Sequence, residues 1–148
     1  HPMGCTLTGV VWLGNRAWLV NAGDSRTYLF RDGIVEQLTM DEENEDGLLT
    51  NCVGGGSDTT LAVTEITGKL QEGDTILICS DGLADVVNDD YLEYFLMNSL
   101  SPAEELAEWA MENGSTDNVS VIAARVGGGE FGDPAEGPDD DGRFDAWV

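Results

Sequence analysis

The sequence predicts an α+β fold in which antiparallel strands fill the first half of the chain and helices follow. The chain has 148 residues, a length that allows one domain with a substantial core. The first half consists of short alternating apolar runs, separated by turn-forming pairs such as Gly14-Asn15 and Asp32-Gly33. Two segments with apolar residues at helical spacing come next, before a final strand-like run. Together these patterns indicate strands and helices that share one core.

The predicted strands of the first half form a meander of antiparallel neighbours. Their ranges are Cys5–Leu13, Ala17–Ala22, Ser25–Arg31 and Ile34–Leu38. The Asp-Gly pair between the last two runs is among the strongest short signals for a β-hairpin. A charge run at 41–47 follows, with five acids in seven positions, and its composition predicts an exposed loop. Leu48–Gly56 closes on three glycines and predicts a turn or a short apolar return.

The second half alternates between strand and helix signals. Thr59–Ile66 alternates as a strand, and Thr75–Cys79 is a continuous apolar run, which predicts a strand buried on both faces. Asn118–Val126 has the composition of a last strand. Between these strands the chain carries the two helical segments.

Helix-start signals mark both helical segments. Asn88 is placed to cap the first helix, whose first turn is acidic and therefore favourable to the helix dipole. Ser101 is the predicted N-cap of the second helix, with Pro102 at the first helical position and Glu104 completing a capping box. Gly114 is the predicted stop signal of that helix.

The composition changes at Gly127, which divides the chain into a folded part at 1–126 and an acidic tail at 127–148. The tail carries seven acids, one Arg and six Gly without any periodicity, which indicates a flexible, solvated segment. Phe144 and Trp147 leave a second interpretation open, in which these aromatic side chains dock on the folded part or on a partner.

The charge and the cysteines exclude several classes of protein. The formal net charge is −23, from 29 acidic and 6 basic residues, which rules out a basic nucleic-acid binder and a polybasic membrane-surface protein. No run of 18 apolar residues is present, so the sequence predicts no membrane insertion. Cys5 and Cys79 lie in apolar runs, which predicts small buried side chains in a reducing compartment, the cytoplasm.

Three aspartates stand at the predicted ends of strands. Asp81 directly follows the buried apolar run, Asp117 opens the last strand, and Asp24 lies between two strands of the meander. An ionised carboxylate beside a core is costly unless it is paired or metal-bound, and the chain has only six Lys and Arg. Each aspartate alone is compatible with a turn or a cap. Together they favour a site for Mg²⁺ or Mn²⁺, since hard oxygen ligands without His suit these ions.

Six short motifs over residues 3–126 follow the order found in one enzyme family. Gly23-Asp24-Ser25-Arg26 is similar to its GDSR strand pair. The other motifs, which are similar to its Gly-Thr-Thr, LTxDH, LGG, GDxLLLCSDGL and DNxT segments, are Met3–Leu7, Leu38–Asp41, Asn51–Gly55, Gly73–Leu83 and Ser115–Ser120. The sequence therefore resembles the metal-dependent protein phosphatases of type 2C (the PPM family), in their compact bacterial form.

This resemblance implies a four-layer α-β-β-α sandwich with two metal ions, and a weaker third, in a cleft at one end of the sheets. It implies that Asp81 and Asp117 bind the second metal and that Asp24 joins Asp81 at a third, weaker one. A hydroxide bridging two Mn²⁺ or Mg²⁺ ions would attack phosphoserine or phosphothreonine. The implied partner is a phosphoprotein of a serine/threonine kinase pathway.

The chain also departs from the family pattern. The family's first half, with its metal-bridging aspartate and nearby His, is absent, so we expect a C-terminal portion of a phosphatase domain of roughly 240 residues. We therefore predict that this chain alone holds one metal or none. Glu42 stands where the LTxDH motif has His, and Asp41–Gly56 is too short for the long flap of many members.

Two alternatives to an enzyme remain open at this point. A catalytically inactive phosphatase fold could serve as a binding or regulatory module, and the missing bridging carboxylate favours this. A calcium-binding acidic protein is a third class, because Asp41–Cys52 has acids at positions 1, 3 and 5 of a possible loop. Asp46 occupies the position that needs Gly and Cys52 the one that needs Glu, which argues against it.

Overall fold

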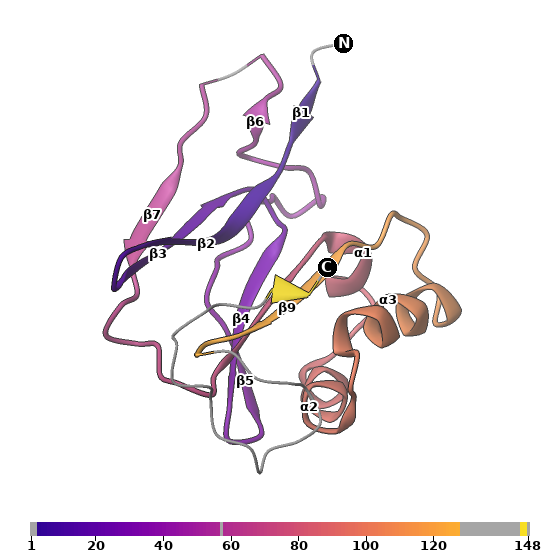
Figure 1. The fold of residues 1–148 in the computed structure, drawn as a ribbon. Coiled ribbons are helices and arrows are strands. Elements are labelled where there is room, and N and C mark those ends of the chain that lie inside the picture. The colour runs from indigo at the N-terminus through magenta and orange to yellow at the C-terminus, as the bar shows by residue number, and fades with distance from the viewer. Residues whose placement is uncertain (1–2, 57, 128–145, 148) are drawn as a thin grey trace.

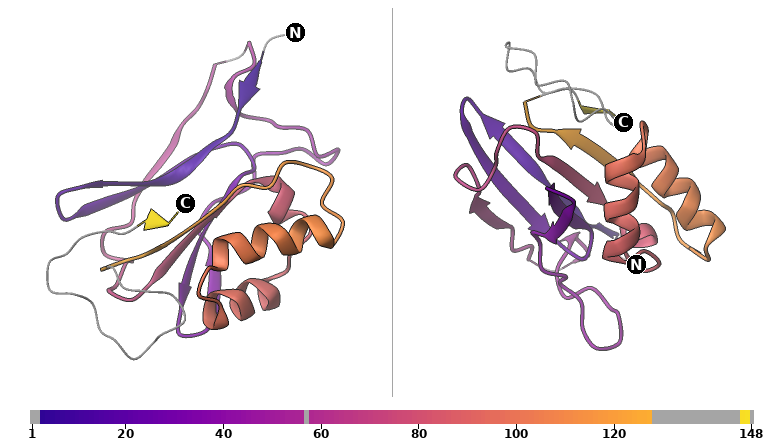
Figure 2. Two further views of the ribbon diagram at one scale, coloured as in Figure 1. Left: turned by 45° about the vertical axis from the view of Figure 1, so that its right-hand side comes forward. Right: turned by 90° about the horizontal axis from the view of Figure 1, so that it is seen from below.

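Two antiparallel sheets lie face to face, and helices cover the far side of one of them (Figures 1 and 2). The computed structural model describes residues 3–56, 58–127 and 146–147 of the chain. In these residues the layers are a three-stranded sheet, a five-stranded sheet and three helices. The α+β class and the antiparallel sandwich predicted from the sequence are confirmed.

The strands pair in three groups. The larger sheet has the order β10-β9-β8-β4-β5, the smaller one has β2-β3-β7, and β1 pairs with β6. Their bounds are β1 Gly4–Cys5, β2 Leu7–Leu13, β3 Arg16–Ala22, β4 Arg26–Arg31, β5 Ile34–Gln37, β6 Val53–Gly54, β7 Ala62–Glu65, β8 Thr75–Cys79, β9 Val121–Arg125 and β10 Ala146–Trp147. The alternating run at 5–13 is thus split into β1 and β2.

The predicted meander is wrong at one point, because β3 and β4 belong to different sheets. The hairpins β2–β3 and β4–β5 form as expected, but β3 pairs next with β7 and β4 with β8. The chain changes sheets at Gly23, whose φ of 113° is one that glycine adopts easily. A Cβ atom at this position would lie 2.6 Å from the Thr6 side chain, so the close packing here also requires a residue without a side chain.

Alternate residues of β4 face the two neighbouring layers. Thr27 faces the smaller sheet, where its hydroxyl lies 2.9 Å from that of Thr8 on β2. The next residue, Tyr28, is in register with Leu77 of β8 and belongs with it to the core beneath the helices. Thr75–Cys79 forms β8 with the predicted bounds and is buried along most of its length. The main core therefore lies between the larger sheet and the helices.

Three helices form this covering layer (Figure 2). Their bounds are α1 Asp81–Ala84, α2 Asp89–Asn98 and α3 Pro102–Glu112. They bury Leu83, Leu92 and Leu106 against the sheet, and each of these side chains is 0% exposed. The short helix α1 was not predicted, since its four residues are too few to show a helical period.

The helix caps confirm one prediction and correct another. The Asn88 side chain accepts a hydrogen bond of 3.0 Å from the Tyr91 backbone N–H, as an N-cap should. Ser101 does occupy the N-cap of α3, but its side chain makes no capping bond. Its backbone N–H instead donates to the Ser99 hydroxyl at 2.9 Å, so the predicted capping box does not form.

The cysteines and the C-terminal residues complete the fold. Cys79 is buried, and burial raises the pKa of its thiol to about 12, which keeps it protonated at neutral pH. Cys5 is exposed, contrary to the prediction, because β1 pairs only with the two-residue strand β6. Trp147 lies in β10, which pairs with β9, whereas Phe144 lies outside the described residues. Among the described helices, none has the length and apolar character to cross a membrane.

Candidate metal centre

Asp24 lies in the turn where the chain passes from β3 to β4. Gly23, before it, has both backbone groups engaged: its N–H donates to Glu42 Oε2 at 2.7 Å and its carbonyl accepts from the Glu42 N–H at 3.2 Å. Ser25, after it, is buried and lies 2.8 Å from the Thr6 hydroxyl. The turn that presents Asp24 is thus fixed on both sides.

Asp81 is the first residue of α1, directly after β8. Its Oδ1 accepts a hydrogen bond of 2.8 Å from the Gly82 N–H. A carboxylate in the first turn of a helix is favoured by the free N–H groups there. The expected position at the carboxyl end of the buried strand is therefore confirmed, with a helix start in place of a simple turn.

The loop with Asp117 packs against this helix start. Ser80 donates from its hydroxyl to the Asn118 carbonyl and accepts from the Ser120 N–H, both at 3.0 Å. A Cβ atom at Gly82 would lie 2.4 Å from the Asn118 carbonyl oxygen, so the close approach requires glycine. Asp117 itself accepts from the Asn118 N–H at 2.7 Å. Asp81 and Asp117 thus stand on two segments in direct contact.

Asp24 shares its surroundings with other carboxylates. Burial raises the pKa of Asp24, and the negative charge of Asp81 raises it further, followed by smaller contributions from Glu43 and Asp85. The negative charge of Asp81, at the start of α1, therefore acts on Asp24 in the turn between β3 and β4. A divalent cation between these groups would remove the repulsion that raises this pKa.

The donor atoms around Asp24 and Asp81 are of the type that a hard cation binds, because they are carboxylate oxygens without sulfur or imidazole. There are fewer of them than a metal site needs. Within residues 3–56, 58–127 and 146–147, no three His, Cys, Asp or Glu side chains are grouped closely enough to hold a metal ion. Asp24 thus lies within reach of the charge of Asp81, and Asp117 lies on the loop that packs against the start of α1. The convergence of all three carboxylates stays a prediction.

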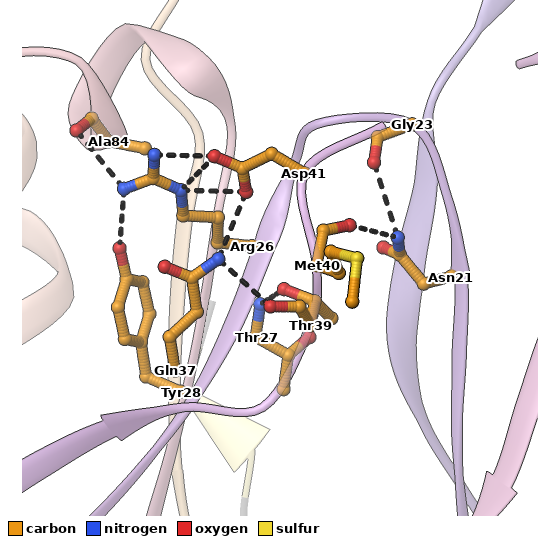
Figure 3. A network of polar contacts seen from close by, with 10 residues as sticks. All are labelled: Asn21, Gly23, Arg26, Thr27, Tyr28, Gln37, Thr39, Met40, Asp41 and Ala84. Carbon is orange, nitrogen blue, oxygen red and sulfur yellow. Dashed lines mark hydrogen bonds and ion pairs between the residues drawn. The ribbon is translucent and has the colours of Figure 1, made fainter. Parts of the chain in front are cut away.

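An ion pair that sequence analysis missed stabilises the region around the Asp24 turn and α1. Arg26 donates from Nε and Nη2 to the two oxygens of Asp41, at 3.0 and 2.6 Å (Figure 3). Its Nη1 reaches the Tyr28 hydroxyl at 3.1 Å and, at 3.5 Å, the Ala84 carbonyl at the end of α1. Gln37 adds a hydrogen bond of 2.9 Å to Asp41. Arg26 thus ties the strand after Asp24 to the helix that starts with Asp81.

The signal available in the sequence was that each residue of this pair belongs to a recognised motif. Arg26 is the last residue of the GDSR-like motif, and Asp41 is the aspartate of the LTxDH-like one. A two-pronged Arg–carboxylate pair fixes direction as well as distance, which suits the bracing of a site.

A hollow of about 230 Å³ lies between the two sheets. Five of its eight lining residues carry hydroxyl groups, and the lining is Thr6, Thr8, Ser25, Ile78, Cys79, Ser80, Ser120 and Ile122. Ser25 and Ser80 in this lining are the sequence neighbours of Asp24 and Asp81, and most of the accessible lining is apolar.

Comparison with known proteins finds homologues of this chain. The chain is 34% identical over 148 residues to the serine/threonine protein phosphatase PstP of Mycobacterium tuberculosis, covering 88% of this chain and 29% of PstP. It is 30% identical over 158 residues to a probable protein phosphatase 2C of rice, covering 82% of this chain and 41% of that protein. The chain thus spans less than half the length of these relatives. No protein-family model matches it.

Solved structures share the fold. PppA, a regulatory component of the type VI secretion system of Pseudomonas aeruginosa, superposes with a TM-score of 0.75 at 28% identity, over 83% of this chain and 58% of PppA. The catalytic domain of PstP in complex with two manganese ions superposes with a TM-score of 0.65 at 35% identity, over 83% of this chain and 59% of that domain.

Proposed function

This chain is homologous to part of the domain of the type 2C (PPM) serine/threonine phosphatases, and on that premise we propose that it supplies metal ligands to such an enzyme. The proposed reaction is the hydrolysis of phosphoserine and phosphothreonine in proteins by a metal-activated water. The proposed ligands are Asp24, Asp81 and Asp117. The observation that carries this proposal is the contact between the loop that bears Asp117 and the helix start that bears Asp81, made by the Ser80–Asn118 hydrogen bond of 3.0 Å.

The chain's own residues would hold and orient the metal ions, for which we propose Mn²⁺ or Mg²⁺. Asp24 and Asp81 would supply hard oxygen ligands, and the Ser80–Asn118 contact would hold Asp117 beside them. The brace from Arg26 to Asp41 would keep the two carboxylate-bearing turns in place. When bound, two such ions lower the pKa of a shared water and neutralise charge on the phosphoryl group.

We further propose which residues of this chain belong to the phosphatase domain. Residues 1–126 belong to the phosphatase domain, as its C-terminal portion, and residues 127–148 form an acidic extension. The relatives' domain continues beyond the region matched here, since this chain covers 58% of PppA and 59% of the PstP catalytic domain. In this proposal the remaining part of the domain completes the ligand set.

The substrate we propose is a phosphoprotein of a serine/threonine kinase pathway. The support is the homology to proteins named serine/threonine phosphatases. The free thiols of Cys5, Cys52 and Cys79 agree with a reducing compartment, and we propose the cytoplasm.

The test is Mn²⁺-dependent hydrolysis of p-nitrophenyl phosphate by the full-length gene product that contains this chain. In a D81N/D117N double variant we expect activity to fall by about 100-fold or more, since even loss of a supporting residue costs metal sites roughly 10- to 100-fold. A D89N/D90N double variant removes the same charge from the exposed first turn of α2 and serves as the control. It should remain near wild type.

Two results would argue against the proposal. Full activity in D81N/D117N would show that these carboxylates bind no essential metal. A folded full-length protein without any Mn²⁺- or Mg²⁺-dependent activity would instead favour a phosphatase fold that serves as a binding or regulatory module.

A further inference from the structure

The turn before Asp24 is held by a residue from a distant loop. The Gly23 N–H donates to Glu42 Oε2 at 2.7 Å, and the Glu42 N–H donates back to the Gly23 carbonyl at 3.2 Å. The buried Asn21 side chain donates a further bond of 3.2 Å to the same carbonyl (Figure 3). Both polar backbone groups of Gly23 are therefore occupied, and Glu42 accounts for one bond to each.

Glu42 is itself fixed from the other end of its loop. The acidic loop, residues 41–51, folds back on itself, so that the Thr50 N–H donates to the Glu42 carbonyl at 2.8 Å. Asn51 donates from Nδ2 to Glu42 Oε2 at 2.8 Å and to the Thr60 carbonyl at 2.6 Å. One carboxylate oxygen thus accepts from Gly23 and from Asn51 and links the loop to the turn.

Because of this link, Glu42 acts on Asp24 in a different way from the neighbouring acidic residues. Glu43 is exposed, and it acts on Asp24 only through its charge, whereas Glu42 is half-buried and holds the residue before Asp24. A hydrogen bond to a carboxylate is stronger than one between neutral groups, which makes Glu42 a firm support. Loss of this support would free the Gly23 peptide and with it the direction of the Asp24 side chain.

We propose that Glu42, anchored by Asn51, is the positioning residue of Asp24 and couples the acidic loop to the metal site. The inference rests on the proposed function, because it takes Asp24 as a metal ligand. Residues that orient the ligands of a metal tune its affinity without touching it. A shift of the acidic loop would pass through the Glu42 carboxylate to the Gly23 peptide and change how well Asp24 meets the ion.

The test compares four forms of the full-length gene product: wild type, E42A, E42Q and E43Q. Amide hydrogen exchange at Gly23 is measured in the metal-free protein, and Mn²⁺ affinity is measured by electron paramagnetic resonance with MnCl₂ as the probe. E42Q and E43Q remove the same charge near Asp24, but only position 42 holds Gly23. E42Q also keeps an oxygen that can accept from Gly23, and it carries the test if E42A does not fold.

In E42A we expect Gly23 exchange to quicken by about tenfold, the effect of losing one hydrogen bond. We expect Mn²⁺ affinity to fall by about tenfold in E42A and by less in E42Q. E43Q should leave Gly23 exchange unchanged and lower affinity by less than about threefold, since an exposed charge contributes little.

Gly23 exchange that is unchanged in E42A would overturn the inference, and so would an equal loss of affinity in E43Q and E42A. If E42A does not fold, Gly23 exchange in E42Q that is no faster than in E43Q would overturn it. Absence of Mn²⁺ binding in the wild type would instead contradict the proposed metal site. The exchange of the Gly23 amide would still decide whether Glu42 holds the turn.

Discussion

The two sheets of the sandwich differ in what lies against their outer faces. The larger sheet packs against the three helices, and its strand β8 is buried along most of its length (Figure 2). In the smaller sheet every residue of β7 is exposed, and Val11 and Leu13 of β2 are exposed as well. Apolar side chains occur in both sheets. The burial of a strand here follows from the layer beside it rather than from its own composition.

The ion pairs of the two sheets show the same difference. The Asp74 side chain, beside the larger sheet, is 2% exposed and accepts two bonds from Arg31 and one from the Gln71 N–H. The pair of Arg16 with Glu65, in the smaller sheet, is 56% and 43% exposed. Only the first pair is deep enough to resist screening by water.

The largest effect we expect comes from removing a core side chain of the larger sheet. Leu77 is 0% exposed, whereas Val63 of β7 is 55% exposed. Leu77→Ala should lower the free energy of unfolding by about 3 kcal/mol, within the usual range for a buried leucine. Val63→Ala should change it by less than about 0.5 kcal/mol. Urea denaturation at pH 7 measures both, and equal losses would show that the smaller sheet is covered after all.

A smaller effect is expected at the buried ion pair. Asp74→Asn keeps the shape of the side chain but removes the charge that pairs with Arg31, so about 2 kcal/mol of stability should be lost. This figure lies below the range for fully buried pairs because the Arg31 side chain is 32% exposed. The loss should persist in 1 M NaCl. A loss that disappears in salt would show that this pair is screened in the same way as the exposed pair of Arg16 with Glu65.

The smallest effect is expected at Glu65. Its hydrogen bonds with Arg16, and then with Thr67, lower the pKa of Glu65 from its ordinary 4.5 to about 2. A lowered folded-state pKa means that this carboxylate stabilises the fold above about pH 4.5 and loses that contribution as the pH falls toward 2. The pair is exposed, so Glu65→Gln should flatten the acid limb of the stability curve only slightly, and 1 M NaCl should erase the difference. A large difference that survives salt would contradict the assignment.

Local signals in the sequence predicted much of this fold. The hairpin turns at 14–15 and 32–33, the bounds of β8 and the Asn88 cap depend on neighbouring residues, and all are found. The sheet change at Gly23 was missed because the turn packs against Thr6, the residue between β1 and β2. The exposure of Cys5 was missed for a related reason, since burial depends on which strand lies alongside.

The residue types of the candidate site were predictable from the sequence. The residues that hold those side chains in place were less so. The position of Asp81 at a strand end could be derived from the pattern, whereas its proximity to Asp24 came from the family resemblance. The bracing pair of Arg26 and Asp41 joins residues 15 positions apart on different segments. Glu42 was recognised only as a departure from the family's His. Its bond to the Gly23 peptide depends on the folded backbone, which no spacing rule describes.

The central claim is that Asp24, Asp81 and Asp117 meet at one metal centre. The most direct measurement is anomalous diffraction at the manganese edge from crystals of the full-length gene product grown with MnCl₂. We predict anomalous peaks bound by the carboxylates of these three aspartates. Manganese bound at other residues only, with these carboxylates free of metal, would contradict the account.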